Sequence, residues 1–178
     1  MKIYIIRHGL TNYNKIGRIN SRGVDEPLAP EGVAQAEETS QNMPEGIVKI
    51  YASPLLRTRQ TADILNKDLG LEIEYAPELM EVDFGLFTDR TWVEIEEEYK
   101  GFRRSFTDQT YDFTSHNGES ITDVVGRARK MIEKIKKDHV NERVLLVTHG
   151  GVVRAIHNIY NNEILGETKN ATIYEIEV

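Results

Sequence analysis

Two histidines in this chain stand at the ends of short apolar runs, and each is followed by glycine. His8 comes after the run 2–6 and Arg7, and His149 comes after the run 144–147. A neutral imidazole is a competent covalent nucleophile when one of its ring nitrogens is free. The glycine beside each ring lets a ligand approach the backbone closely. Both segments are therefore candidates for nucleophilic chemistry on a small ligand.

Arginines near the same segments supply positive charge. Arg7 precedes His8, and Arg57 falls in the first turn of a helix expected after the run 47–52. A guanidinium matches phosphate oxygens with a rigid fork of donors, and helix N-termini add free backbone N–H groups. Together these groups would form a cationic pocket for a tetrahedral dianion. Phosphoryl transfer needs little beyond such positioning and charge stabilisation.

The elements that must position these residues alternate between strands and helices. Strands are predicted at 2–6, 47–52, 71–75, 144–147 and 171–178, and helices at 30–41, 54–69, 120–135 and 150–160. Ser53 is expected to cap the second helix, with Pro54 at its first position. The alternation favours a three-layer α/β/α sandwich with a mostly parallel central sheet. Ligands of such sheets bind beyond the carboxyl ends of the strands, where both histidines fall.

Composition narrows the class of protein. The chain has 178 residues, a formal charge of −7 and no cysteine. The length predicts one domain, 1–178, and the acidic balance argues against a nucleic-acid or anionic-membrane partner. The lack of cysteine excludes a thiolate nucleophile and fits a cytoplasmic protein. The first apolar run is too short for a signal peptide or a membrane helix. The aromatic segment 86–118 is expected to be a lid or substrate-specificity segment.

Five ordered blocks resemble the histidine phosphatase superfamily, also called the phosphoglycerate mutase-like family. The blocks are Arg7-His8-Gly9 with Thr11 and Asn14; Ser53-Pro54-Leu55 with Arg57, Gln60, Thr61 and Ala62; Leu79 and Glu81 with Phe84-Gly85; Gly118-Glu119-Ser120; and Val147-Thr148-His149-Gly150. They span nearly the whole chain, and five ordered blocks are far more specific than one Arg-His-Gly. The resemblance implies a phosphoglycerate mutase-like fold.

The resemblance also implies a role for each matching residue. His8 would attack phosphorus and hold the phosphoryl group, while Arg7, Arg57 and His149 would contact the phosphate oxygens. Glu81 would protonate the leaving oxygen and then activate the water that attacks the phosphohistidine. The further substrate contacts would be Asn14, Thr11, Ser21, the backbone N–H of Gly150, Arg103 and Arg104. No metal and no cofactor is implied.

Three functions remain open from the sequence. The first is a short, broad-specificity phosphomonoester hydrolase acting on small phosphorylated metabolites. The second is a phosphoglycerate mutase-type phosphotransferase, in which Arg103 and Arg104 hold a second anion; alternatively, these two arginines form an exposed basic turn. However, the chain has the segment 81–85, Glu-Val-Asp-Phe-Gly, where mutases carry Arg-His-Tyr-Gly around their acid. The third is a non-catalytic phosphate-binding module, which would normally have lost His8, an arginine or the acid. At two places the sequence departs from the pattern of many family members: Ile19-Asn20-Ser21 stands where many have Gln-Gly, and Phe87-Thr88 stands where many have Trp and Gly. These positions shape the mouth of the pocket, so the natural substrate is left open.

Overall fold

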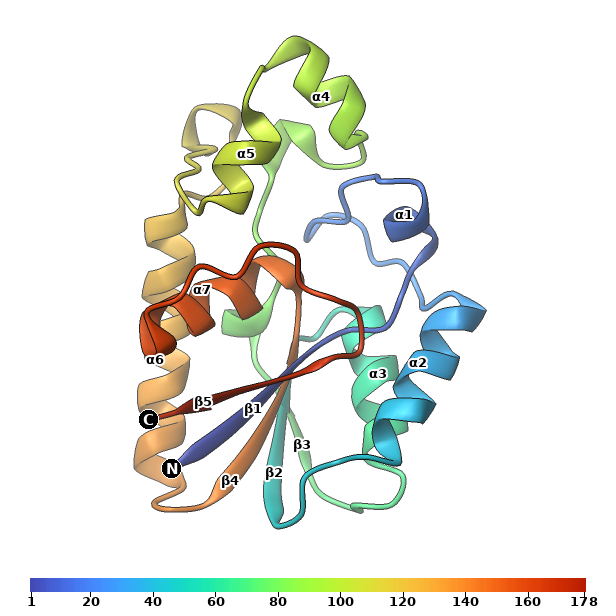
Figure 1. Ribbon diagram of the computed structural model, residues 1–178, viewed down its shortest axis with the longest axis vertical. Coiled ribbons are helices and arrows are strands. Elements are labelled where there is room, and N and C mark those ends of the chain that lie inside the picture. Colours follow the sequence, from blue (N-terminus) through green and yellow to red (C-terminus); the bar gives the residue numbers. More distant parts are fainter.

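Five strands form the middle layer of the computed structural model, which describes residues 1–178 (Figure 1). They are β1 (Lys2–Arg7), β2 (Ile47–Ala52), β3 (Ile73–Tyr75), β4 (Arg143–Thr148) and β5 (Ile173–Glu177), in the order β3-β2-β4-β1-β5. Only β5 runs antiparallel to its neighbour. In the register of β1 and β4, Arg7 pairs with Thr148, so His8 and His149 leave the sheet side by side.

Helices cover both faces of this sheet and complete the predicted three-layer sandwich. Figure 1 shows α2 (Pro30–Ser40) and α3 (Leu56–Leu65) on one side, and α6 (Ile121–Asp138) and α7 (Gly150–Asn161) on the other. Helix α6 begins at the predicted capping box, in which Ser120 and Asp123 bind each other's backbone N–H. None of the helices combines the length and the apolar character needed to cross a bilayer.

The second predicted helix differs from expectation at both ends. It runs from Leu56 to Leu65 rather than from 54 to 69, and Leu55 stands at its N-cap. Ser53 is not the cap: its hydroxyl is 2.8 Å from the His149 ring and accepts only from Leu55 N–H, at 3.4 Å, before the helix begins. At the other end, the Asn66 side chain pairs with both the N–H and the C=O of Leu71. This closed turn stops the helix early and shortens the strand predicted at 71–75 to β3.

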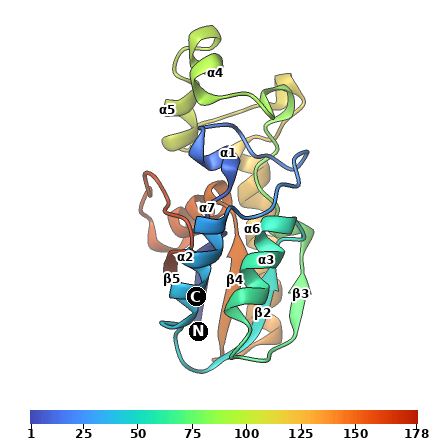
Figure 2. The same cartoon turned by 90° about the vertical axis from the view of Figure 1, so that its right-hand side faces the viewer.

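Residues 86–118, here called the cap, lie above the carboxyl ends of the strands (Figures 1 and 2). The cap contains two short helices, α4 (Trp92–Glu98) and α5 (Phe102–Thr107); another short helix, α1 (Asn12–Lys15), lies in the loop after β1. Buried aromatic rings hold the cap together, with Phe102 4.5 Å from Phe87 and 4.9 Å from Phe113 between ring centroids. These rings belong to the same apolar cluster as the sheet residues Ile3 and Leu146.

Candidate active site

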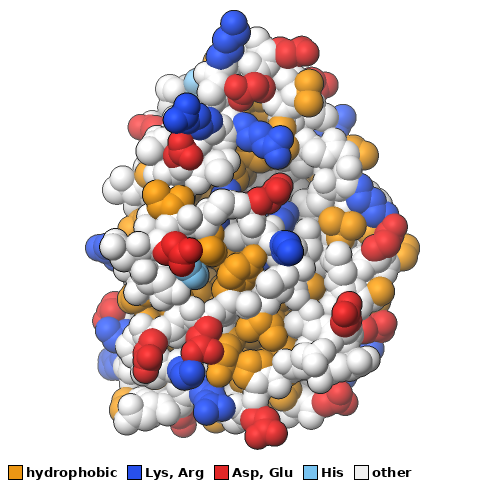
Figure 3. All heavy atoms as spheres, in the orientation of Figure 1, with side chains coloured by type: hydrophobic (Ala, Val, Ile, Leu, Met, Phe, Trp, Pro, Cys, Tyr) orange, Lys and Arg blue, Asp and Glu red, His pale blue; other side chains and the backbone are white.

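A cavity of about 290 Å³ lies between the cap and the carboxyl ends of β1 and β4. This size is close to the lower limit of about 300 Å³ for small-molecule sites. Its lining is mainly polar, and the charged members are Arg7, Arg18, Arg103, Arg154, Glu81 and Glu167. Arginines outnumber acids, so the cavity favours an anionic ligand even though the chain as a whole is acidic. Figure 3 shows charged side chains of both signs on the molecular face below the cap.

His8 lies at the floor of this cavity, directly after β1, and only 3% of its surface is exposed. Its Nδ1 is 2.7 Å from the carbonyl oxygen of Gly9. A carbonyl can only accept, so Nδ1 carries the proton and Nε2 keeps a free lone pair. Burial, with repulsion from Arg57 and Arg7, holds the pKa of His8 well below its usual range. The ring is therefore neutral at pH 7 and able to act as a nucleophile.

His149 lies beside His8, with 5.2 Å between the ring centroids. It follows β4 and occupies the N-cap position of α7. Its Nε2 is 2.8 Å from the hydroxyl of Ser53, whereas its Nδ1 is buried and has no partner. Burial, with repulsion from Arg57 and His8, also lowers the pKa of His149 well below its usual range. A second neutral imidazole with an unused ring nitrogen thus faces the nucleophile.

The two predicted phosphate-binding arginines lie close to His8, Arg57 fully buried and Arg7 partly buried. Arg7 donates to the carbonyl of Thr168 at 2.6 Å, and its Nε has no partner. Arg57 is fully buried, donates to the carbonyls of Val24 and Asn20 at 3.0 Å, and also has an unpaired Nε. Burial lowers the pKa of Arg57 to about 10, so it remains charged at neutral pH. Both guanidinium groups keep hydrogen-bonding capacity that the protein does not use.

Glu81 reaches the cavity from the loop before the cap and is mostly buried. Its Oε1 accepts hydrogen bonds from the backbone N–H of Val82 at 2.9 Å and of Gly151 at 3.1 Å. The second donor belongs to the first turn of α7, whose N-terminus favours a negative group. A Cβ on Gly151 would lie 2.7 Å from this carboxylate oxygen, so only glycine leaves room for the contact.

Three charged residues, Glu119, Arg22 and Arg127, fix the loop that carries Glu81. Glu119 binds Arg22 at 2.7 Å and Arg127 at 3.1 Å. Arg127 also donates to the carbonyls of Glu78 at 2.7 Å and Met80 at 2.6 Å. The Glu119 of the fourth sequence block therefore positions the carboxylate loop from outside the cavity.

Three of the predicted substrate contacts line the cavity, namely Asn14, Gly150 and Arg103. Asn14 accepts a hydrogen bond from Asn170 at 3.3 Å, and Asn170 also donates to the carbonyl of His8 at 2.9 Å. This link ties the loop after β1 to the loop before β5. Asn14 therefore sits at the same end of the cavity as the nucleophile.

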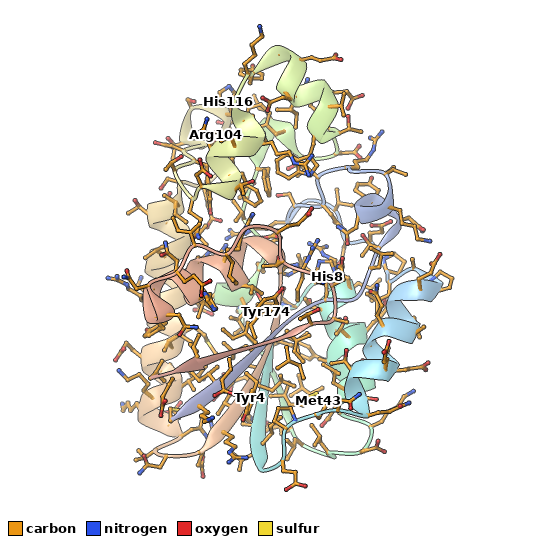
Figure 4. The ribbon with its side chains drawn as sticks, in the orientation of Figure 1. Tyr4, His8, Met43, Arg104, His116 and Tyr174 are labelled. Carbon is orange, nitrogen blue, oxygen red and sulfur yellow. The ribbon has the colours of Figure 1, made fainter.

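Thr11, Ser21 and Arg104, also expected to contact the substrate, do not line the cavity; nor do the fully buried Arg57 and His149, although both lie close to His8. Thr11 is fully buried and caps α1. The Ser21 hydroxyl donates to the carbonyl of Val82 and accepts from Phe84 N–H, both at 3.1 Å, so it braces the Glu81 loop. Arg104 has a side chain 85% exposed and pairs with Asp108 at 3.2 Å. Figure 4 shows it in the cap, well away from His8.

Sequence reasoning missed Arg154 and Glu167, both of which line the cavity. Arg154 is buried on α7, and its guanidinium carbon lies 4.1 Å from the centre of the Phe106 ring. Its spacing of four residues from Gly150 could have identified it, because such residues share one helix face. Glu167 lies in the irregular loop between α7 and β5, where no local pattern marks a cavity residue.

Comparisons with known proteins agree with this geometry. The family model for the histidine phosphatase superfamily (branch 1) matches residues 3–177. A probable phosphoglycerate mutase GpmB from Escherichia coli O1:K1 is 32% identical over 84% of this chain and 70% of its own length. The corresponding protein from Enterobacter sp. strain 638 is 34% identical over the same shares.

Solved structures with the same fold include one protein named as a phosphatase and one named as a mutase. A mycobacterial glucosyl-3-phosphoglycerate phosphatase has a TM-score of 0.88 at 25% identity, covering 99% of this chain and 92% of its own. A phosphoglycerate mutase from Thermus thermophilus has a TM-score of 0.81 at 26% identity, covering 99% and 93%. The match over almost every residue, together with the arrangement around His8, shows that the chain belongs to the histidine phosphatase superfamily.

Proposed function

We propose that this phosphoryl-transfer enzyme hydrolyses small phosphomonoesters through a phosphohistidine on His8. One observation carries the proposal: a buried neutral imidazole, with Nδ1 fixed by the Gly9 carbonyl, shares its cavity with the carboxyl group of Glu81. Nucleophile and proton donor are the two groups that a two-step ester hydrolysis requires. Nothing in the proposed chemistry calls for a bound cofactor.

In the first step, the Nε2 lone pair of His8 attacks phosphorus and the ester P–O bond breaks. Glu81 gives its proton to the leaving oxygen, so the alcohol departs neutral. Arg7, Arg57 and His149 surround His8 and stabilise the charge that spreads over the equatorial oxygens. In the second step, Glu81 takes a proton from water, the water oxygen bonds to phosphorus, and the P–N bond breaks. The products are inorganic phosphate and the free enzyme.

Hydrolysis is favoured over a mutase reaction by the outer part of the cavity. A mutase must hold a second anionic group firmly, because its phosphorylated intermediate must not escape. Arg104 does not line the cavity, and the carboxylate of Glu167, 3.8 Å from Arg103, would repel the second phosphate dianion of a bisphosphorylated intermediate. The mutase remains the second candidate because curated relatives bear that name.

The cap is proposed to select the leaving group. Its side chains Trp92, Arg103 and Phe106 line the cavity on the side opposite the sheet. We also propose a cytoplasmic location, which is supported by the complete absence of cysteine. The proposed partner is a small phosphorylated metabolite rather than a nucleic acid or a membrane, in keeping with the acidic net charge.

The test compares the wild type with His8→Ala on para-nitrophenyl phosphate in the presence of EDTA. His139→Ala is the matched control, because this histidine binds Tyr51 and does not line the cavity. We expect turnover by the wild type and the control and none by His8→Ala. Mass spectrometry of rapidly quenched enzyme should find a phosphoryl group on His8. Turnover that survives His8→Ala would refute the assignment of the nucleophile.

A further inference from the structure

Three consecutive residues of the loop between α7 and β5 each hold one arginine of the cavity. The pairs are the Gly166 carbonyl with Arg154 at 3.4 Å, the Glu167 carboxylate with Arg103 at 3.8 Å, and the Thr168 carbonyl with Arg7 at 2.6 Å. The arginines come from α7, from the cap and from β1. This short segment therefore gathers positive charge from three parts of the chain around one space.

Glu167 differs from its two neighbours because it contributes a full negative charge rather than a carbonyl. Apart from Glu81, it is the only acidic side chain that lines the cavity. The side chains of Glu167 and Arg103 are 88% and 63% exposed, and ion pairs this exposed are weak. Both groups are therefore available to a ligand that offers each of them a better partner.

Outside the phosphate site, positive and negative side chains of the cavity lie next to one another. Of the arginines outside the phosphate site, Arg18 is paired with Asp89 at 3.1 Å, which leaves Arg103 and Arg154, and Arg154 is buried with an unpaired Nε. Glu167 stands next to both, paired with Arg103 and following the residue that binds Arg154. A leaving group with only negative charge would be repelled by Glu167, and a neutral one would leave all three charges unused. A leaving group that carries one carboxylate and one ammonium on the same carbon satisfies them together.

We propose, on the basis of the phosphatase function above, that the substrate is a phosphorylated α-amino acid. Its carboxylate binds Arg103 and Arg154, and its ammonium group binds Glu167. A charge-assisted hydrogen bond to a carboxylate is stronger than a neutral one, so the ammonium group contributes directly to selection. A phosphorylated hydroxy acid of the same shape would satisfy the arginines but would offer Glu167 only a hydroxyl.

The matched substrates are O-phospho-L-serine and 3-phosphoglycerate, which differ in an ammonium or a hydroxyl group beside the carboxylate. We expect wild-type kcat/KM to favour phosphoserine by about tenfold or more, the effect of one charge-assisted hydrogen bond. Glu167→Gln should bring the ratio close to one. Glu163→Gln changes an exposed acid of the same loop that does not line the cavity, and should leave the ratio unchanged. A wild type that favours phosphoglycerate, or a Glu167→Gln variant that keeps the wild-type ratio, would overturn the proposal.

Equilibrium binding to His8→Ala separates the ligand class from the reaction. Calorimetry should show phosphoserine binding more tightly than phosphoglycerate, with the difference lost in the His8→Ala, Glu167→Gln double variant. Such binding without release of phosphate by the wild type would refute hydrolysis and uphold the ligand class. Equal or tighter binding of phosphoglycerate would refute the ligand class, whatever the enzyme hydrolyses.

Discussion

The hydroxyl oxygen of Ser53 lies 2.8 Å from Nε2 of His149, while the Nδ1 of this ring is buried and unpaired. A neutral imidazole carries one proton, so the role of Ser53 decides the role of Nδ1. When the hydroxyl donates to Nε2, the proton resides on Nδ1, which can then donate to a phosphate oxygen. Ser53 thereby prepares His149 for an anion without touching the anion itself.

Ser53→Ala is expected to lower kcat about tenfold, because His149 loses the hydrogen bond at Nε2 that keeps its proton on Nδ1, worth about 1–1.5 kcal/mol. The control is Ser40→Ala, whose hydroxyl binds the Glu37 carbonyl at the exposed end of α2. Steady-state kinetics on para-nitrophenyl phosphate should show the loss only in the first variant. An unchanged kcat for Ser53→Ala would mean that this contact is not needed to orient His149.

Glu81→Gln should separate the two chemical steps. A carboxamide cannot transfer a proton, but para-nitrophenolate leaves without one. Rapid mixing should therefore show a burst of about one para-nitrophenolate per enzyme, followed by turnover slowed by about 10²–10⁴-fold. An alkyl monoester, which needs the proton, should give no burst. Glu78→Gln, in the same loop but outside the cavity, should behave as the wild type. Rapid steady turnover by Glu81→Gln would contradict the proposed role.

The stability of the protein should fall in mild acid because His8 and His149 are buried and neutral. Their pKa values in the folded protein lie well below that of the unfolded chain, which is about 6.5. Above this pH neither state binds a proton at these sites. Below it, only the unfolded chain does, so the free energy of unfolding decreases by about 2 kcal/mol per histidine by pH 5.

Urea unfolding at a series of pH values measures this effect. His149→Asn should lose less stability than the wild type between pH 6.5 and pH 5, because one of the two buried imidazoles is absent. If the free energy of unfolding of the wild type and of His149→Asn falls equally between pH 6.5 and pH 5, His149 does not resist protonation in the folded state.

Gly151→Ala should damage the site more than the fold. The added Cβ would lie 2.5 Å from a methyl group of Val82 and 2.7 Å from the Glu81 carboxylate, which must move out of line. We expect kcat to fall by about 10²-fold, as for a small misplacement of a reacting group. The control is Gly126→Ala on the exposed face of α6, where a Cβ meets nothing and should stabilise the helix by about 0.5–1 kcal/mol. Normal activity of Gly151→Ala would show that Glu81 tolerates displacement.

The parts of the structure that depend on local patterns were predictable. Apolar runs marked the strands, and their parallel order brought His8 and His149 to one edge. The capping residues Ser120 and Asp123 fixed the start of α6. Each of these features depends on neighbours in the chain, so periodicity and turn chemistry are sufficient to find it.

The errors concern side chains whose partners are distant in sequence. A serine before proline is a good helix cap, but Ser53 binds a ring 96 residues away. The Ser21 hydroxyl likewise donates to the carbonyl of Val82, and Glu167 meets Arg103 only in the folded chain. Short hydroxyl and carboxylate groups fit many partners equally well, and tertiary structure decides among them.

The cap and the sheet share one continuous apolar cluster, and this limits how substrates come and go. Swinging the cap away as a unit would expose buried rings at a cost of about 1.5–3 kcal/mol for each large side chain. A gate with that cost would rarely open, so ligands are expected to pass through the standing mouth of the cavity. Changes of substrate can then arise from single replacements on the inner wall of the cap. The cap residues available for this are Trp92, Arg103, Phe106 and Thr107.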